Sequence, residues 1–216
     1  MKKLLLIPAL ACALAACDEK SAPAADGLLN PDTTAMKRAA PDSFDVTFET
    51  GKGPFVVRAY RAWAPVGVDR FHYLVSNNYY DGVKFFRNID DFMVQFGIHG
   101  DPAVNRAWRN RTIARDSVRQ SNTEGMVTYA MGPSPDTRTT QLFINKANNA
   151  SLDALGFAPI GRVISGMDIV QKLFSGYGEG APRGGGPDQG RIQAEGNRYL
   201  NSYFPQLDSI ITARIR

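Results

Sequence analysis

The chain has little of the chemical equipment that most enzymes use. It contains two cysteines and two histidines in 216 residues, and both cysteines, Cys12 and Cys17, lie within the first seventeen residues. The rest of the chain therefore has no disulfide and must fold on its hydrophobic core alone. His72 and His99 do not stand at a spacing from carboxylates or thiols that would build a metal site. We expect no metal and no cofactor.

Other common functional signatures are also missing. No nucleophile elbow, phosphate-binding glycine loop or dinucleotide-binding turn follows a predicted strand. The formal net charge is only +4, and the five arginines between Arg106 and Arg119 are interrupted by Asp116. Nucleic-acid binding usually needs a stronger and more contiguous basic surface, so we expect no nucleic-acid partner.

The N-terminal segment has the order of parts found in a cleaved signal peptide. Lys2 and Lys3 are basic, residues 4–14 are apolar but too few to span a bilayer, and small residues then lead to Cys17. The run Leu14-Ala15-Ala16-Cys17 resembles the lipobox of bacterial lipoproteins, in which the cysteine is lipidated. We therefore expect a signal peptide at 1–16, lipidation of Cys17 and a flexible tether at 17–43, which has few large apolar residues. A plain secretory signal with an incidental cysteine is the alternative.

These features predict a location. We expect the protein in the bacterial cell envelope, anchored by lipid, with its domain facing the periplasm or the exterior. Asp18 after Cys17 resembles the inner-membrane retention signal of enteric bacteria, but that rule varies between lineages. The choice between inner and outer membrane stays open.

Residues 44–216 are long enough for one domain with a full core. Alternating apolar residues from Phe44 to Phe48 indicate a half-buried strand. Further strands are predicted at 55–60, 83–87, 92–97, 126–131, 141–145, 160–163 and 207–215. Helices are predicted at 66–76 and 167–174, with a further helical piece at 193–203. Eight strands can close a barrel filled by side chains, so we expect a mainly β fold: an eight-stranded antiparallel closed β-barrel capped by two helices.

A glycine-rich segment interrupts this pattern near its end. Residues 175–190 hold seven glycines in sixteen positions and are predicted to be a loop. The sequence assigns no role to this segment or to the chain that follows it.

Candidate chemistry gathers around one predicted hairpin. Arg87, Met93 and Gln95 come close together across the turn formers of residues 88–91, and Met93 and Gln95 point to the same face. Taken singly, these residues favour a structural interpretation: a surface salt bridge of Arg87 with Asp90 or Asp91, and ordinary core for Phe92 and Met93.

A resemblance to a known family favours a site. The runs Tyr79-Tyr80-Asp81-Gly82, Phe86-Arg87 and Phe92-Met93-Val94-Gln95 resemble the signature of the cyclophilins, which are peptidyl-prolyl cis–trans isomerases. Gln141-Leu142-Phe143-Ile144, Leu152-Asp153 and the run from Ile160 to Met167 resemble later motifs of that family. The similarity extends from about Phe44 to Phe174, in the family's order and approximate spacing.

The resemblance implies the roles of particular residues. Arg87 and Gln95 would be catalytic. The substrate-binding residues would be Phe92, Met93, Ala130, Met131, Phe143, Leu152 and Phe157. Around Ala130 and Met131 the family holds its substrate through main-chain groups, as an added strand. The sequence departs from many eukaryotic members at Ser151, where they have a tryptophan, and at Phe157, where they have a histidine.

The predicted function is isomerisation of X–Pro bonds in exported proteins, which aids their folding. The partners would be proline-containing polypeptide clients and, through the lipid, a membrane; we expect a monomer. A non-catalytic module that binds proline-containing peptides, as a chaperone or scaffold, is the alternative. It would need the same groove but not Arg87.

Overall fold

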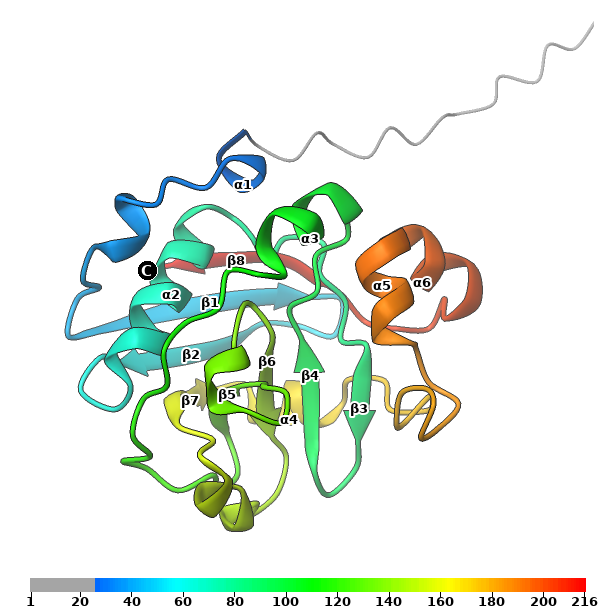
Figure 1. Ribbon diagram of the computed structural model, residues 1–216. Coiled ribbons are helices and arrows are strands. Elements are labelled where there is room, and N and C mark those ends of the chain that lie inside the picture. The colour runs from blue at the N-terminus through cyan, green and yellow to red at the C-terminus, as the bar shows by residue number, and fades with distance from the viewer. Residues whose placement is uncertain (1–25) are drawn as a thin grey trace, which may run out of the picture.

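A computed structural model describes residues 26–216 (Figure 1). One antiparallel sheet of eight strands forms its centre, in the order β3-β4-β6-β5-β7-β2-β1-β8. The strands are β1 (Ser43–Thr50), β2 (Phe55–Tyr60), β3 (Arg87–Ile89), β4 (Met93–Phe96), β5 (Met126–Tyr129), β6 (Leu142–Asn145), β7 (Pro159–Ser165) and β8 (Ile210–Ile215). The mainly β, antiparallel prediction is confirmed.

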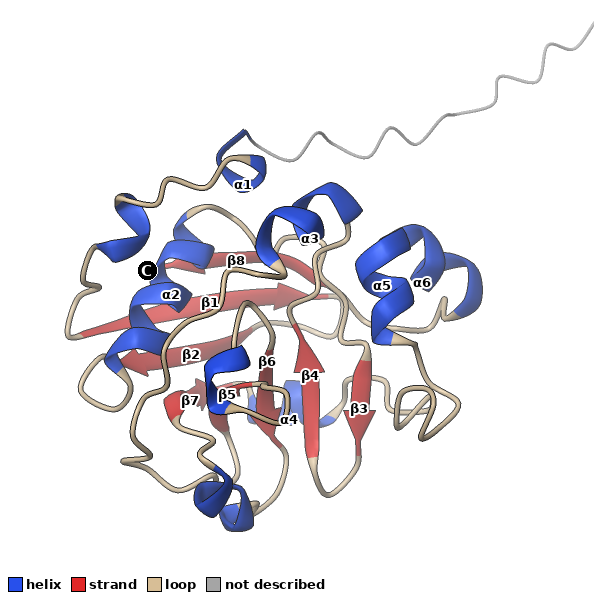
Figure 2. Ribbon diagram, in the orientation of Figure 1, coloured by secondary structure: helices blue, strands red, loops and turns tan. Residues whose placement is uncertain are grey.

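Short helices surround the sheet, as the colours of Figure 2 show. The α-helices are α1 (Asp26–Leu29), α2 (Pro65–Ser76), α3 (Pro102–Trp108), α4 (Met167–Gln171), α5 (Gln189–Glu195) and α6 (Asn197–Tyr203). Three 3₁₀ turns are η1 (Ala35–Lys37), η2 (Pro135–Thr137) and η3 (Ala150–Leu155). The sequence predicted α2, α4 and the region of α6, but it missed α3 and η3. None of the helices within residues 26–216 has the length and apolar character needed to cross a membrane.

The closed barrel predicted from the sequence is wrong, because the sheet is an open, curled half-barrel. Its two end strands, β3 and β8, do not pair with each other. The chain ahead of β3 does reach the start of β8: the Gly82 N–H donates to the Ile210 carbonyl at 2.8 Å, and Lys84 forms an isolated bridge with Ser209. The main-chain groups of residues 82–85, where a strand was predicted at 83–87, therefore bond to the chain around Ser209. Strand β3 begins only at Arg87 and pairs with β4 alone.

The core lies between the concave sheet and α2. Val68, Phe71 and Leu74 of α2 are buried, as their helical spacing predicts. Phe48 stacks on Phe55 with ring centroids 4.9 Å apart, and Phe96 packs edge-on against Phe48 at 5.9 Å. These aromatic side chains fill the space that the curled sheet encloses.

The flexible tether predicted for residues 17–43 is wrong from Asp26 onward. Leu28 is buried, and its carbonyl accepts a hydrogen bond from the indole N–H of Trp108 at 2.9 Å. Further along, the Ala40 N–H donates to Asp69 in α2. The few apolar residues of this stretch suffice because they pack on helices α2 and α3 and do not have to form a core of their own. The predicted signal peptide 1–16 and the lipidation site Cys17 lie outside the described residues.

A second, smaller core forms beyond the glycine-rich segment (175–190). Helices α5 and α6 lie at the right in Figure 1, and α5 contacts α3. Six buried residues make up this second core: Phe86, Ile98, Ile192, Tyr199, Leu200 and Leu207. Phe86 directly precedes Arg87, the first residue of β3. The chain from 175 to 207, called the extension below, therefore packs against the start of the strand that carries Arg87.

Candidate active site

The hairpin of β3 and β4 places the two predicted catalytic residues opposite each other. Arg87 pairs with Gln95 in the register of the two strands, and Ile89 pairs with Met93. Asp91 makes the turn with a positive φ of 58°, a conformation that Asp tolerates better than most residues. The Arg87 guanidinium donates through Nη1 to Gln95 Oε1 at 3.1 Å and lies 3.8 Å from Met93 Sδ. The hairpin thus brings charged and apolar groups to one face, as the sequence predicted.

Neighbouring strands complete the wall of a cavity of about 570 Å³. Phe143 of β6 pairs with Gln95 of β4, and its ring packs edge-on against Phe157 with centroids 5.7 Å apart. All nine residues predicted for the site line this cavity: Arg87, Phe92, Met93, Gln95, Ala130, Met131, Phe143, Leu152 and Phe157. The structure brings them together, whereas their individual roles remain predictions.

The main chain after β5 borders the cavity. The Ala130 N–H still donates to the Gln141 carbonyl at 2.9 Å, beyond the last residue of the strand. Met131 and Gly132 follow and line the cavity. An extended peptide could lie along this stretch and form main-chain hydrogen bonds.

The wall that contains Leu152 is held by a buried amide. Asn122 donates through Nδ2 to Asp153 Oδ1 at 2.7 Å and to the Phe157 carbonyl at 2.8 Å. Its own Oδ1 accepts from the Thr128 hydroxyl of β5 at 2.8 Å. This network fixes η3 and Phe157 to the sheet. The sequence analysis did not identify Asn122, because its partners are at least six residues away along the chain.

An acidic partner of Arg87 was missed as well. Glu179, from the glycine-rich segment, accepts from Arg87 Nε and Nη2, both at 2.7 Å. Arg87 holds the pKa of Glu179 below its usual range through these hydrogen bonds. The surface salt bridge with Asp90 or Asp91 that was considered for Arg87 does not form. The two partners are 92 positions apart in the chain, so no local pattern could have indicated this pair.

Gln95 connects Arg87 to a further residue that was not assigned to the site. While Gln95 Oε1 accepts from Arg87, Gln95 Nε2 donates to Gln141 Oε1 at 2.9 Å. Because an amide nitrogen carries two hydrogens, one N–H of Gln95 is left for another partner. Gln141 also lines the cavity.

The two histidines have packing roles. His72 packs edge-on against Phe44 with ring centroids 4.9 Å apart, and His99 accepts from the Asp101 N–H through Nδ1. Burial lowers the pKa of both rings. Within residues 26–216, no three His, Cys, Asp or Glu side chains come together in a way that could hold a metal ion.

Comparisons with known proteins agree with this geometry. Residues 45–189 match the family described as cyclophilin type peptidyl-prolyl cis-trans isomerase/CLD. A peptidyl-prolyl cis-trans isomerase of Acinetobacter baylyi is 35% identical over 132 residues, which cover 59% of this chain and 70% of that protein. Peptidyl-prolyl cis-trans isomerase B of Escherichia coli is 29% identical over 136 residues, which cover 59% and 82%.

Solved structures show the same fold. A cyclophilin-type isomerase of Cryptosporidium parvum superposes with a TM-score of 0.56 at 17% identity, covering 81% of this chain and 98% of that one. The cyclophilin AquaCyp293 of Hirschia baltica gives a TM-score of 0.54 at 20% identity, covering 82% and 75%.

Proposed function

Because the chain belongs to the cyclophilin family and is a peptidyl-prolyl cis–trans isomerase, we propose that it isomerises X–Pro bonds in exported proteins and so aids their folding. The observation that carries the proposed site is the cavity in which Arg87 and Gln95 meet a ring of apolar side chains. Neither a nucleophile nor a metal is needed for this reaction. Rotation about the X–Pro bond is slow because it breaks amide resonance, which sets a barrier of about 20 kcal/mol.

Arg87 is proposed as the group that lowers this barrier. When the X–Pro bond is twisted, the proline nitrogen regains its lone pair and becomes pyramidal. An N–H of Arg87 that donates to this lone pair stabilises the twisted state more than either planar state, which is the requirement for catalysis. A barrier lower by about 7 kcal/mol would accelerate the rotation roughly 10⁵-fold.

The remaining residues are proposed to hold the substrate. Phe92, Met93, Phe143 and Leu152 would enclose the proline ring. Gln95 would use its second Nε2 hydrogen to bind the carbonyl that precedes the bond. The main chain at Ala130 and Met131 would pair with the peptide as an added strand, which depends little on sequence.

We further propose that the domain is exported and anchored by a lipid on Cys17. Support comes from the order of basic, apolar and small residues before Cys17. The chain packs on the domain from Asp26 onward, so only residues 18–25 separate the anchor from the packed chain. Eight residues span at most about 28 Å, which would keep the domain close to the membrane surface.

Fractionation of cells tests the anchor. The Cys17→Ala protein should leave the membrane fraction after a high-salt wash and retain wild-type isomerase activity. Retention of this variant in the membrane would contradict the lipid anchor. A wild type that is itself soluble would favour a plain secretory signal.

A refolding assay tests the role in protein folding. The wild type should accelerate the slow, proline-limited phase of a denatured exported protein, and Arg87→Ala should not. Equal acceleration by both proteins would favour the non-catalytic peptide-binding module.

A further inference from the structure

The glycine-rich segment (175–190) delivers a carboxylate to the catalytic guanidinium. Glu179 holds Arg87 in a two-pronged ion pair, with both N–O distances at 2.7 Å. We propose that Glu179 is a positioning residue for the isomerase reaction, which fixes the Arg87 guanidinium in the orientation that serves the proline nitrogen. The proposal rests on the catalytic role proposed for Arg87.

Counting the donors of Arg87 shows what this ion pair leaves free. The guanidinium has five N–H groups in a fixed plane. Glu179 accepts from Nε and from one hydrogen of Nη2, while Gln95 Oε1 and Met93 Sδ accept from the two hydrogens of Nη1. Among the described residues, Nη2 donates only to Glu179, so its second hydrogen is left for the substrate. Because Glu179 and Gln95 hold the plane of the guanidinium from two sides, the free Nη2 hydrogen points in one fixed direction.

Orientation matters more here than net charge. The twisted X–Pro bond gains a lone pair on a neutral nitrogen and not a full negative charge. A correctly directed N–H therefore contributes more than the positive charge that the carboxylate offsets. A displacement of about 1 Å in a catalytic group can cost on the order of 100-fold in rate.

The segment around Glu179 is built to present this carboxylate at a fixed place. The Gly180 N–H donates to Glu179 Oε1 at 2.9 Å, and the Gly186 N–H donates to the Glu179 carbonyl at 2.9 Å. A side chain at Gly184 would overlap this carbonyl, and a Cβ at Gly186 would lie only 2.8 Å from it. Glycine at these two positions lets the loop close on itself behind Glu179.

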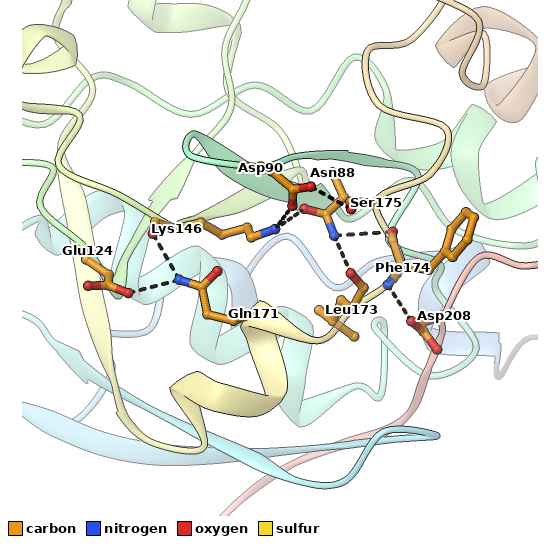
Figure 3. A network of polar contacts seen from close by, with 9 residues as sticks. All are labelled: Asn88, Asp90, Glu124, Lys146, Gln171, Leu173, Phe174, Ser175 and Asp208. Carbon is orange, nitrogen blue, oxygen red and sulfur yellow. Dashed lines mark hydrogen bonds and ion pairs between the residues drawn. The ribbon is translucent and has the colours of Figure 1, made fainter.

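The start of the segment is tied to the strand that carries Arg87. Figure 3 shows Asn88, the next residue of β3, donating through Nδ2 to the carbonyls of Leu173 at 2.8 Å and Phe174 at 3.2 Å. Lys146 donates to Asn88 Oδ1 at 3.0 Å from the other side. The Phe174 N–H donates to Asp208 at 2.7 Å, just ahead of β8. The chain that enters the segment is thus tied to the side chain of Asn88, the residue that follows Arg87.

The end of the segment is held by the second core. Tyr177 packs edge-on against both Phe174 and Phe204, with ring centroids 5.0 Å apart in each case. Closer to α5, the Asp188 N–H donates to the Tyr199 hydroxyl at 3.1 Å. Because these contacts fix both ends of the segment, it can hold Glu179 rigidly. In this way the extension from 175 to 207 would support the reaction through Glu179.

The test replaces the carboxylate by an amide of the same size. Glu179→Gln should lower kcat about tenfold and leave the KM for an Ala-Pro peptide unchanged within a factor of two, since the apolar walls are intact. Glu179→Asp keeps the negative charge but has a shorter side chain, so its kcat should lie between those of the wild type and Glu179→Gln. Asp45→Asn is the matched control, because Asp45 also forms a two-pronged pair with an arginine, Arg58 at 2.6 and 2.7 Å, and lies neither in the extension nor at the cavity. It should behave as wild type.

A spectroscopic readout accompanies the kinetics. The Nε–H resonance of Arg87, assigned through Arg87→Lys, should be shifted and protected from exchange in the wild type and in Asp45→Asn. It should lose both properties in Glu179→Gln. Thermal melts of every variant identify any loss of the fold, in which case Glu179→Asp carries the test.

Three results would overturn the proposal. A kcat of Glu179→Gln equal to that of the wild type would make the ion pair irrelevant to turnover. A higher kcat would show that the carboxylate competes with the substrate for Arg87, and a raised KM alone would make Glu179 part of the binding wall. If Arg87→Ala is inactive in these cases, only the positioning role fails; if Arg87→Ala is fully active, the catalytic assignment itself is wrong.

Discussion

Replacing Arg87 by alanine removes one hydrogen bond that forms only in the twisted state. The structure leaves one Nη2 hydrogen of Arg87 for the substrate, so the loss should resemble that of a single charge-assisted donor in an active site. Such a loss costs about 3–4 kcal/mol, or roughly 100- to 1000-fold in kcat. Peptide affinity should change by less than about threefold, because the walls formed by Phe92, Met93 and Phe143 remain.

The same substitution should cost little stability. The side chains of Arg87 and Glu179 are 19% and 32% exposed, so their ion pair contributes about 1 kcal/mol. For a domain of this size, that loss lowers Tm by about 2–4 °C. Arg58→Ala is a suitable control, because Arg58 forms a comparable pair with Asp45 at 2.6 and 2.7 Å but does not line the cavity. It should show a similar small loss of stability and a wild-type kcat.

The assay follows the cis-to-trans conversion of a short Ala-Pro peptide, with peptide binding measured separately by titration. Arg87→Lys should recover little of the lost rate, since a single flexible ammonium does not reproduce a planar fork of donors. An Arg87→Ala protein that is folded, binds the peptide and isomerises it at the wild-type rate would refute the mechanism. If only binding is lost, Arg87 acts in the ground state and its assigned role is wrong.

Three further predictions concern the pocket, the network of Figure 3 and acid stability. Phe143→Ala should weaken peptide binding about tenfold, roughly 1.4 kcal/mol, because it removes the wall that packs on Phe157; titration checks this. Lys146→Met should lower the free energy of unfolding by about 1–3 kcal/mol in urea melts, because Asn88 Oδ1 is buried and would lose its donor. The pKa of Asp45 is lowered by Arg58, so its contribution is present above the usual carboxyl pKa of about 4 and is lost as the pH falls through the lower folded value. Urea midpoints should therefore decline below about pH 4, and less steeply in Asp45→Asn.

Patterns that repeat along a few residues made most of the fold predictable. Alternation from Phe44 to Phe48 and helical spacing in residues 66–76 report burial directly, and β1 and α2 are where they indicate. The open end of the sheet could not be read this way, because it depends on the bridge between Lys84 and Ser209, which are far apart in the chain. Residues 26–42 were misjudged since a count of apolar side chains ignores the surface on which they pack.

The cavity was predictable for a different reason. Arg87 and Gln95 lie on one hairpin, so their approach is a local event, and the resemblance supplied Phe143, Leu152 and Phe157 from more distant parts of the chain. Neither route reaches Glu179. An acid among glycines has no periodicity, and the family resemblance ended at about Phe174.

Two cores determine where Arg87 lies. Phe85 is buried in the main core, whereas Phe86, the residue just before Arg87, is buried in the second core with Ile192 and Leu200. A change that loosens α5 and α6 therefore reaches β3 directly, even though Ile192 and Leu200 do not line the cavity. Met93, Phe143 and Leu152 of the pocket wall lie on β4, β6 and η3, outside the extension, so such a change should disturb Arg87 more than it disturbs these side chains. Because Ala181 and Pro182 of the extension also line the cavity, we expect a loosened extension to lower turnover through Arg87 and to weaken peptide binding only where these two residues move, whereas Phe143→Ala lowers affinity directly.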